Sequence, residues 1–166
     1  MTTADRSSSE ALLRRVGAVL ETLLRDLPEE TVTAALAADP EAVERRYEAG
    51  LVALQAGDYD AAADAFGEAA AARPAVSRYH FALGLCLQQF GSVTEAMEQF
   101  ATALALDATD AAAAFRLGEC FYALGQLDGA REALQMAVQL CDLPENDPPI
   151  RLLAETLLDQ IARTGA

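Results

Sequence analysis

The sequence repeats itself at a period of 34 residues, and this periodicity limits the fold more than any other feature. Small and apolar residues recur at the same five places in three successive segments. The aligned sets are Gly50, Gly84 and Gly118; Gly57, Gly91 and Gly125; Ala62, Ala96 and Ala130; Phe66, Phe100 and Leu134; and Ala69, Ala103 and Ala137. A tandem unit of this length predicts a stack of like units, in which each unit buries its apolar face against its neighbours.

Composition indicates that each unit is helical. The 166 residues include 37 alanines and 24 leucines, which favour helices, whereas β-branched residues are scarce. The first glycine of each unit falls inside an apolar-periodic helix, where it predicts that a neighbouring helix packs against the missing Cβ. The second glycine follows seven residues later, where a helix end needs a left-handed residue. Each unit is therefore predicted to be a helical hairpin, and the fold class to be an all-α superhelix.

The flanking sequence predicts further helices on either side of the repeats. An apolar stripe at helical spacing precedes them, formed by Leu12, Leu13, Val16, Leu20, Leu23, Leu24 and Leu27. After the repeats, a proline-rich loop leads to Asp147, the predicted N-cap of a final helix. The apolar side of that helix is predicted to comprise Ile150, Leu153, Leu157, Leu158 and Ile161. A single amphipathic helix in this place is suited to cap the open end of the stack.

Three parts of the chain are therefore predicted. They are an N-terminal helical extension (1–42), three repeats (43–76, 77–110 and 111–142), and a loop with a C-terminal capping helix (143–166).

Charge and cysteine content exclude several classes of function. The chain has 26 acidic residues and 12 basic residues, all of them arginines, and a formal net charge of −14. Phosphate backbones would repel such a chain, so we expect no nucleic-acid binding. No apolar run approaches the ~18 residues of a membrane span, and residues 1–10 lack the apolar stretch of a signal peptide. Three cysteines do not suggest a disulfide framework. A cytoplasmic protein without membrane contact is the expectation.

The repeat period also predicts a shared binding surface. Positions 2, 5, 9 and 12 of each unit lie on one side of its first helix, and these first helices line the concave face of a superhelix. Those positions hold Glu44, Tyr47, Leu51 and Leu54; Arg78, Phe81, Leu85 and Gln88; and Ala112, Phe115, Glu119 and Tyr122. All except Ala112 are assigned to a candidate peptide-binding groove. Seven of the twelve are large apolar or aromatic residues, and an exposed strip of that kind is typical of a binding site.

The expected ligand is an extended peptide with spaced apolar side chains. These side chains would enter near Tyr47, Phe81 and Phe115, while Arg78, Gln88 and Glu119 hydrogen-bond the peptide backbone. The alternative interpretation is that the same residues belong to the core and are covered by the chain's own N-terminal helix.

No arrangement of residues predicts catalysis, a metal site or a cofactor. His80 is the only histidine and has no second strong metal ligand nearby, so packing or a surface position is the favoured interpretation. Cys86 and Cys120 occupy equivalent places in consecutive repeats, where inert packing is favoured over redox sensing. Cys141 is expected to be exposed. No paired carboxylates, phosphate-binding loop or nucleophile motif is apparent, and the chain is not expected to be an enzyme.

The repeat unit resembles the tetratricopeptide repeat over residues 43–142. The helix–turn–helix period and the Ala-x3-Phe pattern carry this resemblance. The usual tryptophan is replaced by Arg46, His80 and Ala114, and the repeat-ending proline occurs only as Pro74.

A closer resemblance is to the class II type III secretion chaperones of the LcrH/SycD/IpgC kind. The stretches that carry it are Arg46-Tyr47-x-Ala49-Gly50, Gln55-Ala56-Gly57-Asp58-Tyr59, Arg78-Tyr79, Leu83-Gly84-Leu85-Cys86, Glu119-Cys120 and Leu124-Gly125-Gln126-Leu127-Asp128-Gly129-Ala130. This resemblance implies a bacterial, cytoplasmic, ATP-independent chaperone that binds a proline-containing segment of hydrophobic translocator proteins. It also implies a homodimer through the N-terminal helix, although the apolar stripe could equally pack on the first repeat.

The sequence is also compatible with one other binding function and argues against another. A general scaffold that joins soluble protein partners is the alternative, and the nature of the client distinguishes the two. Repeat domains that clamp the acidic C-termini of heat-shock chaperones use lysines and asparagines. This chain has no lysine and a single asparagine, Asn146, so that specificity is not expected.

Overall fold

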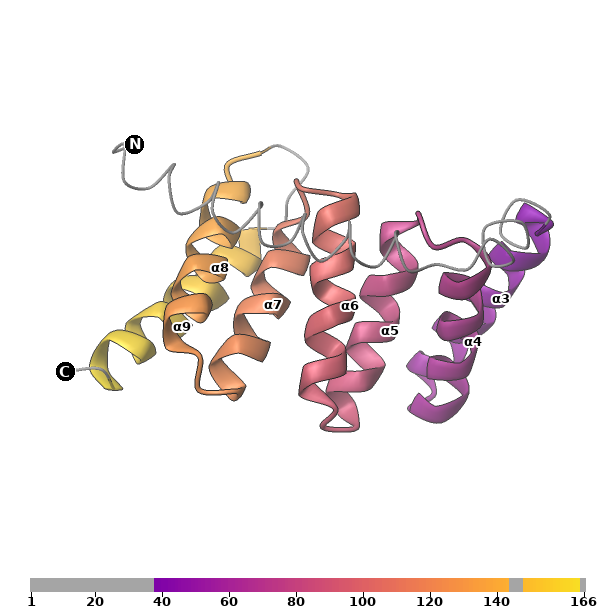
Figure 1. The fold of residues 1–166 in the computed structure, drawn as a ribbon, viewed down its shortest axis with the longest axis horizontal. Helices are drawn as coiled ribbons and strands as arrows, with labels where there is room; N and C mark the ends of the chain where they lie inside the picture. The colour runs from indigo at the N-terminus through magenta and orange to yellow at the C-terminus, as the bar shows by residue number, and fades with distance from the viewer. Residues whose placement is uncertain (1–37, 144–147, 165–166) are drawn as a thin grey trace.

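The computed structural model describes residues 38–143 and 148–164, which form α-helices and no strand (Figure 1). The helices are α3 (Pro40–Gln55), α4 (Tyr59–Ala72), α5 (Ser77–Gln89), α6 (Val93–Leu106), α7 (Ala111–Ala123), α8 (Leu127–Leu140) and α9 (Pro148–Thr164). The predicted all-α fold is confirmed. The predicted N-terminal helix and the predicted N-cap Asp147 lie outside the described residues. No described helix is both long and apolar enough to cross a bilayer.

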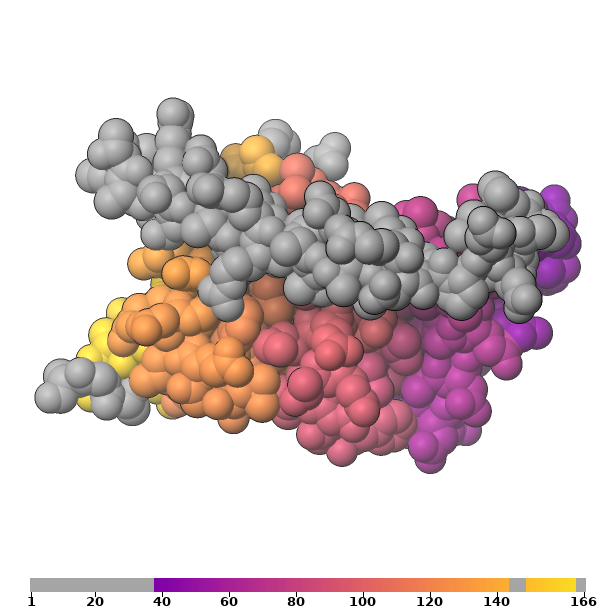
Figure 2. Space-filling view, viewed as in Figure 1, coloured from indigo at the N-terminus to yellow at the C-terminus, as the bar shows by residue number. Residues whose placement is uncertain are grey.

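The helices stand in a row along the long axis of the molecule (Figure 1). Each packs on the helices before and after it in the chain, from α3 on α4 to α8 on α9, and α9 also contacts α7. The pairs α3–α4, α5–α6 and α7–α8 form three hairpins, which adjoin one another in the space-filling view (Figure 2). Because α9 packs on both helices of the third hairpin, it covers the end of the stack.

Within each hairpin, a glycine of the first helix faces a large side chain of the second. A Cβ added to Gly50 would lie 2.6 Å from the Phe66 ring. A Cβ on Gly84 would lie 2.7 Å from the Phe100 ring, and one on Gly118 would lie 2.7 Å from Leu134. All three facing side chains are fully buried. We call these three contacts the glycine seam, and they confirm the predicted close approach of the paired helices.

The second glycine of each unit ends the first helix in the left-handed conformation. The φ angles of Gly57, Gly91 and Gly125 are +78°, +75° and +72°. After α3, the Gly57 N–H donates to the Leu54 carbonyl and the Asp58 N–H donates to the Ala53 carbonyl. The same pair of hydrogen bonds follows α5 and α7. This is the Schellman arrangement, which satisfies carbonyls that a helix end leaves unpaired.

The outer helices differ slightly from the sequence pattern. Helix α3 begins at Pro40, because the Asp39 carboxylate accepts a hydrogen bond from the Glu41 N–H at 3.1 Å and caps the helix. In α9, Ala154 and Ile161 are fully buried, but Leu153, predicted on the same side, is 49% exposed. Leu153 lies about 100° around the helix from Ala154, which places it at the edge of the buried stripe.

Candidate peptide-binding surface

The eleven residues predicted to line a groove lie on α3, α5 and α7, and we call this set the candidate strip. Nine of them are half-buried, as expected for a surface that packs on one side and is open on the other. These nine are Glu44, Tyr47, Leu51, Leu54, Phe81, Leu85, Gln88, Glu119 and Tyr122. Arg78 is exposed, whereas Phe115 is buried and only 5% exposed. Phe115 therefore offers less of its ring to a ligand than the other aromatic members of the strip.

Between α3 and α5, the strip is built from stacked aromatic rings. The Tyr47 ring centroid lies 5.4 Å from that of Phe66 and 5.1 Å from that of Tyr79. The Arg78 guanidinium lies over Tyr47 and over Tyr79, 5.4 and 5.3 Å from the ring centroids. Aromatic pairs and cation–π contacts of this geometry are attractive. Burial raises the pKa of the Tyr47 phenol, so it remains a neutral hydrogen-bonding group.

Polar contacts join the same two helices. Arg78 Nη2 donates to Glu44 Oε2 at 2.5 Å, and the Tyr79 hydroxyl donates to the same oxygen at 3.0 Å. Glu44 belongs to α3 and both donors belong to α5, so these bonds link the first two hairpins. The predicted strip did not include Tyr79, which is 1% exposed and lies one position beyond Arg78. The side chain could have been found as the aromatic residue next to a strip arginine.

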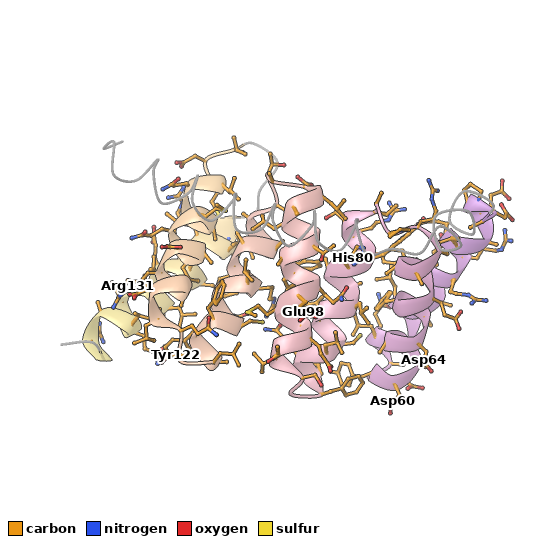
Figure 3. The ribbon with its side chains drawn as sticks, viewed as in Figure 1. Asp60, Asp64, His80, Glu98, Tyr122 and Arg131 are labelled. Atoms are coloured by element: carbon orange, nitrogen blue, oxygen red, sulfur yellow. The ribbon has the colours of Figure 1, made fainter. Side chains whose placement is uncertain are left out.

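The α5 and α7 part of the strip packs on the largest core cluster. Phe81 meets Phe100 edge to face, with 5.6 Å between ring centroids. Leu85 and Tyr122 pack on the same cluster, and Tyr122 lies on α7 close to the turn into α8 (Figure 3). Gln88 Nε2 donates to Cys120 Sγ at 3.6 Å, which connects α5 to α7.

A second arginine lies beside the α7 part of the strip. Arg116 Nη1 donates to Glu119 Oε2 at 2.8 Å, and its guanidinium lies 5.8 Å from the Phe115 ring centroid. Arg116 was not predicted, because it lies one residue beyond the strip position occupied by Phe115. Each arginine of the surface, Arg78 and Arg116, is thus paired with a strip carboxylate, and these four side chains add no net charge.

His80 has a packing role in the structure, as favoured from the sequence. It is 9% exposed, and its Nε2 donates to the Pro74 carbonyl at 2.9 Å. Its Nδ1 lies 2.9 Å from the Gln99 side-chain oxygen, so the ring ties α5 to the preceding loop and to α6 (Figure 3). Among the described residues, no three potential ligands gather in a way that could hold a metal ion.

The cysteines divide into a buried pair and a half-buried residue. Cys86 and Cys120 are fully buried, and burial raises the pKa of both thiols, that of Cys120 to about 11. Neutral, inaccessible thiols agree with the packing interpretation. Cys141 was expected to be exposed but is half-buried, because it directly follows α8 at the edge of the stack.

A separate hollow lies where the start of α3 meets the end of α4 in the first hairpin. It encloses about 190 Å³. Its lining residues are Ala38, Asp39, Ala42, Val43, Arg46, Glu68, Ala69 and Ala72. None of these belongs to the candidate strip, so the hollow is not part of the predicted surface.

Comparison with known families identifies the repeat. Models described as tetratricopeptide repeat match residues 29–75, 47–111 and 87–140. The chain belongs to the tetratricopeptide-repeat family. In this chain, each repeat contains one glycine-seam contact between its two helices and one Schellman turn after its first helix. No curated protein sequence matches the chain significantly.

Several solved structures have the same fold. PcrH from Pseudomonas aeruginosa, in complex with the chaperone binding region of PopD, gives a TM-score of 0.74 at 24% identity, covering 78% of this chain and 98% of that one. The Yersinia enterocolitica type III secretion chaperone SycD, in complex with a peptide of the translocator YopD, gives 0.69 at 23% identity, covering 77% and 98%. The first repeat domain of Spaghetti (RPAP3), bound to the HSP90 peptide SRMEEVD, gives 0.68 at 21% identity, covering 76% and 95%.

Proposed function

We propose that this protein is a cytoplasmic, ATP-independent chaperone of a bacterial type III secretion system. It would hold an extended, proline-containing segment of a hydrophobic translocator against the candidate strip, and so keep the client soluble and competent for secretion. The observation that supports this most is the strip itself, in which half-buried apolar and aromatic side chains run from α3 through α5 to α7. PcrH and SycD, which share the fold, are found with translocator segments.

The energetics of such binding need no nucleotide. Each apolar anchor that a client buries contributes about 1.5–3 kcal/mol before the costs of ordering are subtracted. Several anchors at Tyr47, Leu51, Phe81, Leu85 and Tyr122 therefore suffice for useful affinity. The net charge of −14 would keep the complex with an aggregation-prone client in solution.

The charges of the surface argue against an acidic peptide such as the one bound by RPAP3. Arg78 is paired with Glu44 and Arg116 with Glu119. A carboxylate-rich ligand would have to displace these partners, and the chain has no lysine to replace them. We therefore expect an uncharged apolar segment to be preferred over SRMEEVD.

Self-association is a further part of the proposal. SycD has been solved in an alternative dimer. The apolar residues between Leu12 and Leu27 provide a sequence through which this chain would form a homodimer.

Affinity capture from native lysate tests the function. The wild-type chain and Phe81→Asp would be compared, with bound proteins identified by mass spectrometry. Val52→Asp is the matched control, because Val52 is on α3 but outside the strip and is 67% exposed. Circular dichroism must show that Phe81→Asp is folded, since this ring also packs on Phe100. Hydrophobic secreted proteins held by the wild type and by Val52→Asp, and lost by Phe81→Asp, would support the chaperone. Soluble partners retained by all three would favour the scaffold.

Purified components give a second, more direct measurement. Fluorescence anisotropy would compare a labelled peptide of the PopD chaperone binding region with labelled SRMEEVD. We expect the first to bind and to be weakened by Phe81→Asp, while SRMEEVD does not bind. Tighter binding of SRMEEVD would contradict the proposed specificity.

A further inference from the structure

The first hairpin buries fewer large side chains than the other two. Among the described residues of α3 and α4, only two buried side chains are larger than alanine, and they are Val43 and Phe66. Six occur in α5 and α6, namely Tyr79, His80, Cys86, Phe100, Thr102 and Leu104. Six also occur in α7 and α8, namely Phe115, Leu117, Cys120, Phe121, Leu134 and Met136. Because stabilisation scales with apolar area removed from water, we infer that the described residues hold the first hairpin least strongly.

Among the described residues, the core is also discontinuous at this end. One cluster extends without interruption from α6 to α9. The buried residues of α3 and α4 instead fall into two small clusters, completed by Tyr79 in one and by Ala82 and Cys86 in the other. All three of these residues belong to α5. Among the described helices, α3 and α4 stand at the end of the row (Figure 1), so α5 is the neighbour that holds them.

Helix α4 contains a glycine that no packing contact with the described residues requires. Among residues 38–143 and 148–164, nothing lies within 4 Å of a Cβ added to Gly67, in contrast to the seam glycines. The equivalent positions of the next two repeats are Ala101 and Gln135, so the helix accepts a side chain there. A helical glycine without a packing partner weakens the helix relative to alanine.

The contacts that close α3 onto α5 join Glu44 and Tyr47 of the candidate strip to Arg78 and Tyr79. Tyr47 stacks on Tyr79, and Glu44 accepts hydrogen bonds from Arg78 and Tyr79. A ligand lying across α3 and α5 would touch Glu44, Tyr47 and Arg78, which are at least partly exposed. Opening of the first hairpin would therefore remove Glu44, Tyr47, Leu51 and Leu54 from the binding surface, and a bound ligand would oppose that opening.

We propose that α3 and α4 open and close as a unit while α5–α9 stay folded, and that the client closes this unit when it binds. The coupling to a client rests on the proposed function, whereas the separate opening does not. The apparent affinity for the client is then reduced by the fraction of molecules in which the first hairpin is open. Gly67, which lies on α4 outside the candidate strip, would raise that fraction relative to an alanine.

Hydrogen exchange followed by mass spectrometry on the full chain tests the opening. In the free protein, amides of α3 and α4 should exchange more than about tenfold faster than those of α7 and α8. Gly67→Ala should slow exchange in α3 and α4 by about fivefold and leave α7 and α8 unchanged. The matched control is Gln135→Gly, at the equivalent exposed position of α8, which should speed exchange in the α5–α9 unit and leave α3 and α4 unchanged. Equal exchange in all hairpins, or slowing of every helix by Gly67→Ala, would overturn the proposal.

A client arm separates this inference from the proposed function. The same exchange experiment would be repeated with a peptide of the PopD chaperone binding region. Slowing in α3 and α4 that exceeds the slowing in α7 and α8 is the expected result. Protection of α5–α8 alone would contradict the coupling. No protection in any helix would contradict both the proposed function and the coupling to a client. The separate opening of α3 and α4 is tested by the free protein alone.

Discussion

The first and third hairpins have the same seam and the same turn, yet they are held together differently. In the first, Gly50 faces Phe66 and Tyr47 stacks on the same ring, while Tyr47 and Glu44 also join this hairpin to Tyr79 of α5. In the third, Gly118 faces Leu134 within a cluster that continues into α9. The residues that repeat therefore set the geometry of a hairpin, and the residues that do not repeat set its stability.

The largest expected effect comes from filling the seam at either end. Gly118→Leu would drive a side chain into Leu134, at a cost near or above the upper end of about 1–3 kcal/mol, and should abolish the cooperative unfolding of the whole array. Gly50→Leu would make the same clash with Phe66 but should remove only the helical signal of α3 and α4. Circular dichroism during thermal unfolding distinguishes the two. Complete loss of structure in both variants would show that the first hairpin is as tightly coupled as the third.

A smaller effect is expected at the turns. Gly125→Ala places a Cβ on a residue with φ of +72° and should cost about 1–2 kcal/mol in global stability. Gly57→Ala imposes the same strain at φ of +78°, but its cost should appear as faster exchange of α3 and α4. Urea titration paired with hydrogen exchange measures both. An equal shift of the urea midpoint in the two variants would remove the distinction between the hairpins.

The buried cysteines provide a chemical measure of the same comparison. Cys86 packs with Ala62 and Phe66 of the first hairpin, whereas Cys120 belongs to the large cluster. At pH 8 a thiol reagent such as DTNB should therefore label Cys86 faster than Cys120 in the native protein. The two rates would be measured in Cys86→Ala and Cys120→Ala, each of which keeps one of the two cysteines. Equal labelling rates would contradict the expected difference between the hairpins.

The raised pKa of Cys120 adds a dependence on pH. The folded state favours the neutral thiol, so its stabilising effect is complete below the unfolded pKa of about 8.5. That effect is lost as pH rises towards about 11, where the folded thiol ionises. Cys120→Ala should flatten the fall in thermal stability above pH 9, and Cys86→Ala serves as the comparison.

The smallest effect concerns the two ion pairs. Arg78 and Glu44 join two hairpins, whereas Arg116 and Glu119 lie within α7. A double-mutant cycle with Arg78→Ala and Glu44→Gln should give a coupling free energy below about 1 kcal/mol. This energy would be measured from the hydrogen-exchange rates of α3 and α4. The cycle within α7 should give about 0.2–0.5 kcal/mol. A larger coupling within α7 than between hairpins would contradict the assigned role of Glu44.

Backbone requirements explain why the seam and the turns could be predicted from the sequence. Gly84 is required because the paired helix lies too close for a Cβ, and Gly91 because the backbone has a positive φ angle. Both constraints recur every 34 residues. A position that repeats in three copies can therefore be recognised from the sequence. The candidate strip was predicted by combining the 34-residue repeat with the 3.6-residue period of a helix.

Side chains that act between positions of the pattern were not predictable in this way. Tyr79 and Arg116 each lie one residue beyond a strip position, and they reach Glu44 and Glu119 through their long side chains. The burial of Phe115 depends on how the hairpins stack on one another. Periodicity gives the direction of a Cα–Cβ bond, but the contacts of a long side chain depend on its neighbours in three dimensions.

The glycine seam makes each hairpin an interchangeable module. Gly84 and Phe100 belong to one 34-residue unit, as do Gly50 with Phe66 and Gly118 with Leu134. Copying residues 77–110 in tandem would therefore add a complete hairpin with its own internal seam. Such a duplication would lengthen the candidate strip by the four positions of one repeat, so the length of this surface changes only in whole repeats.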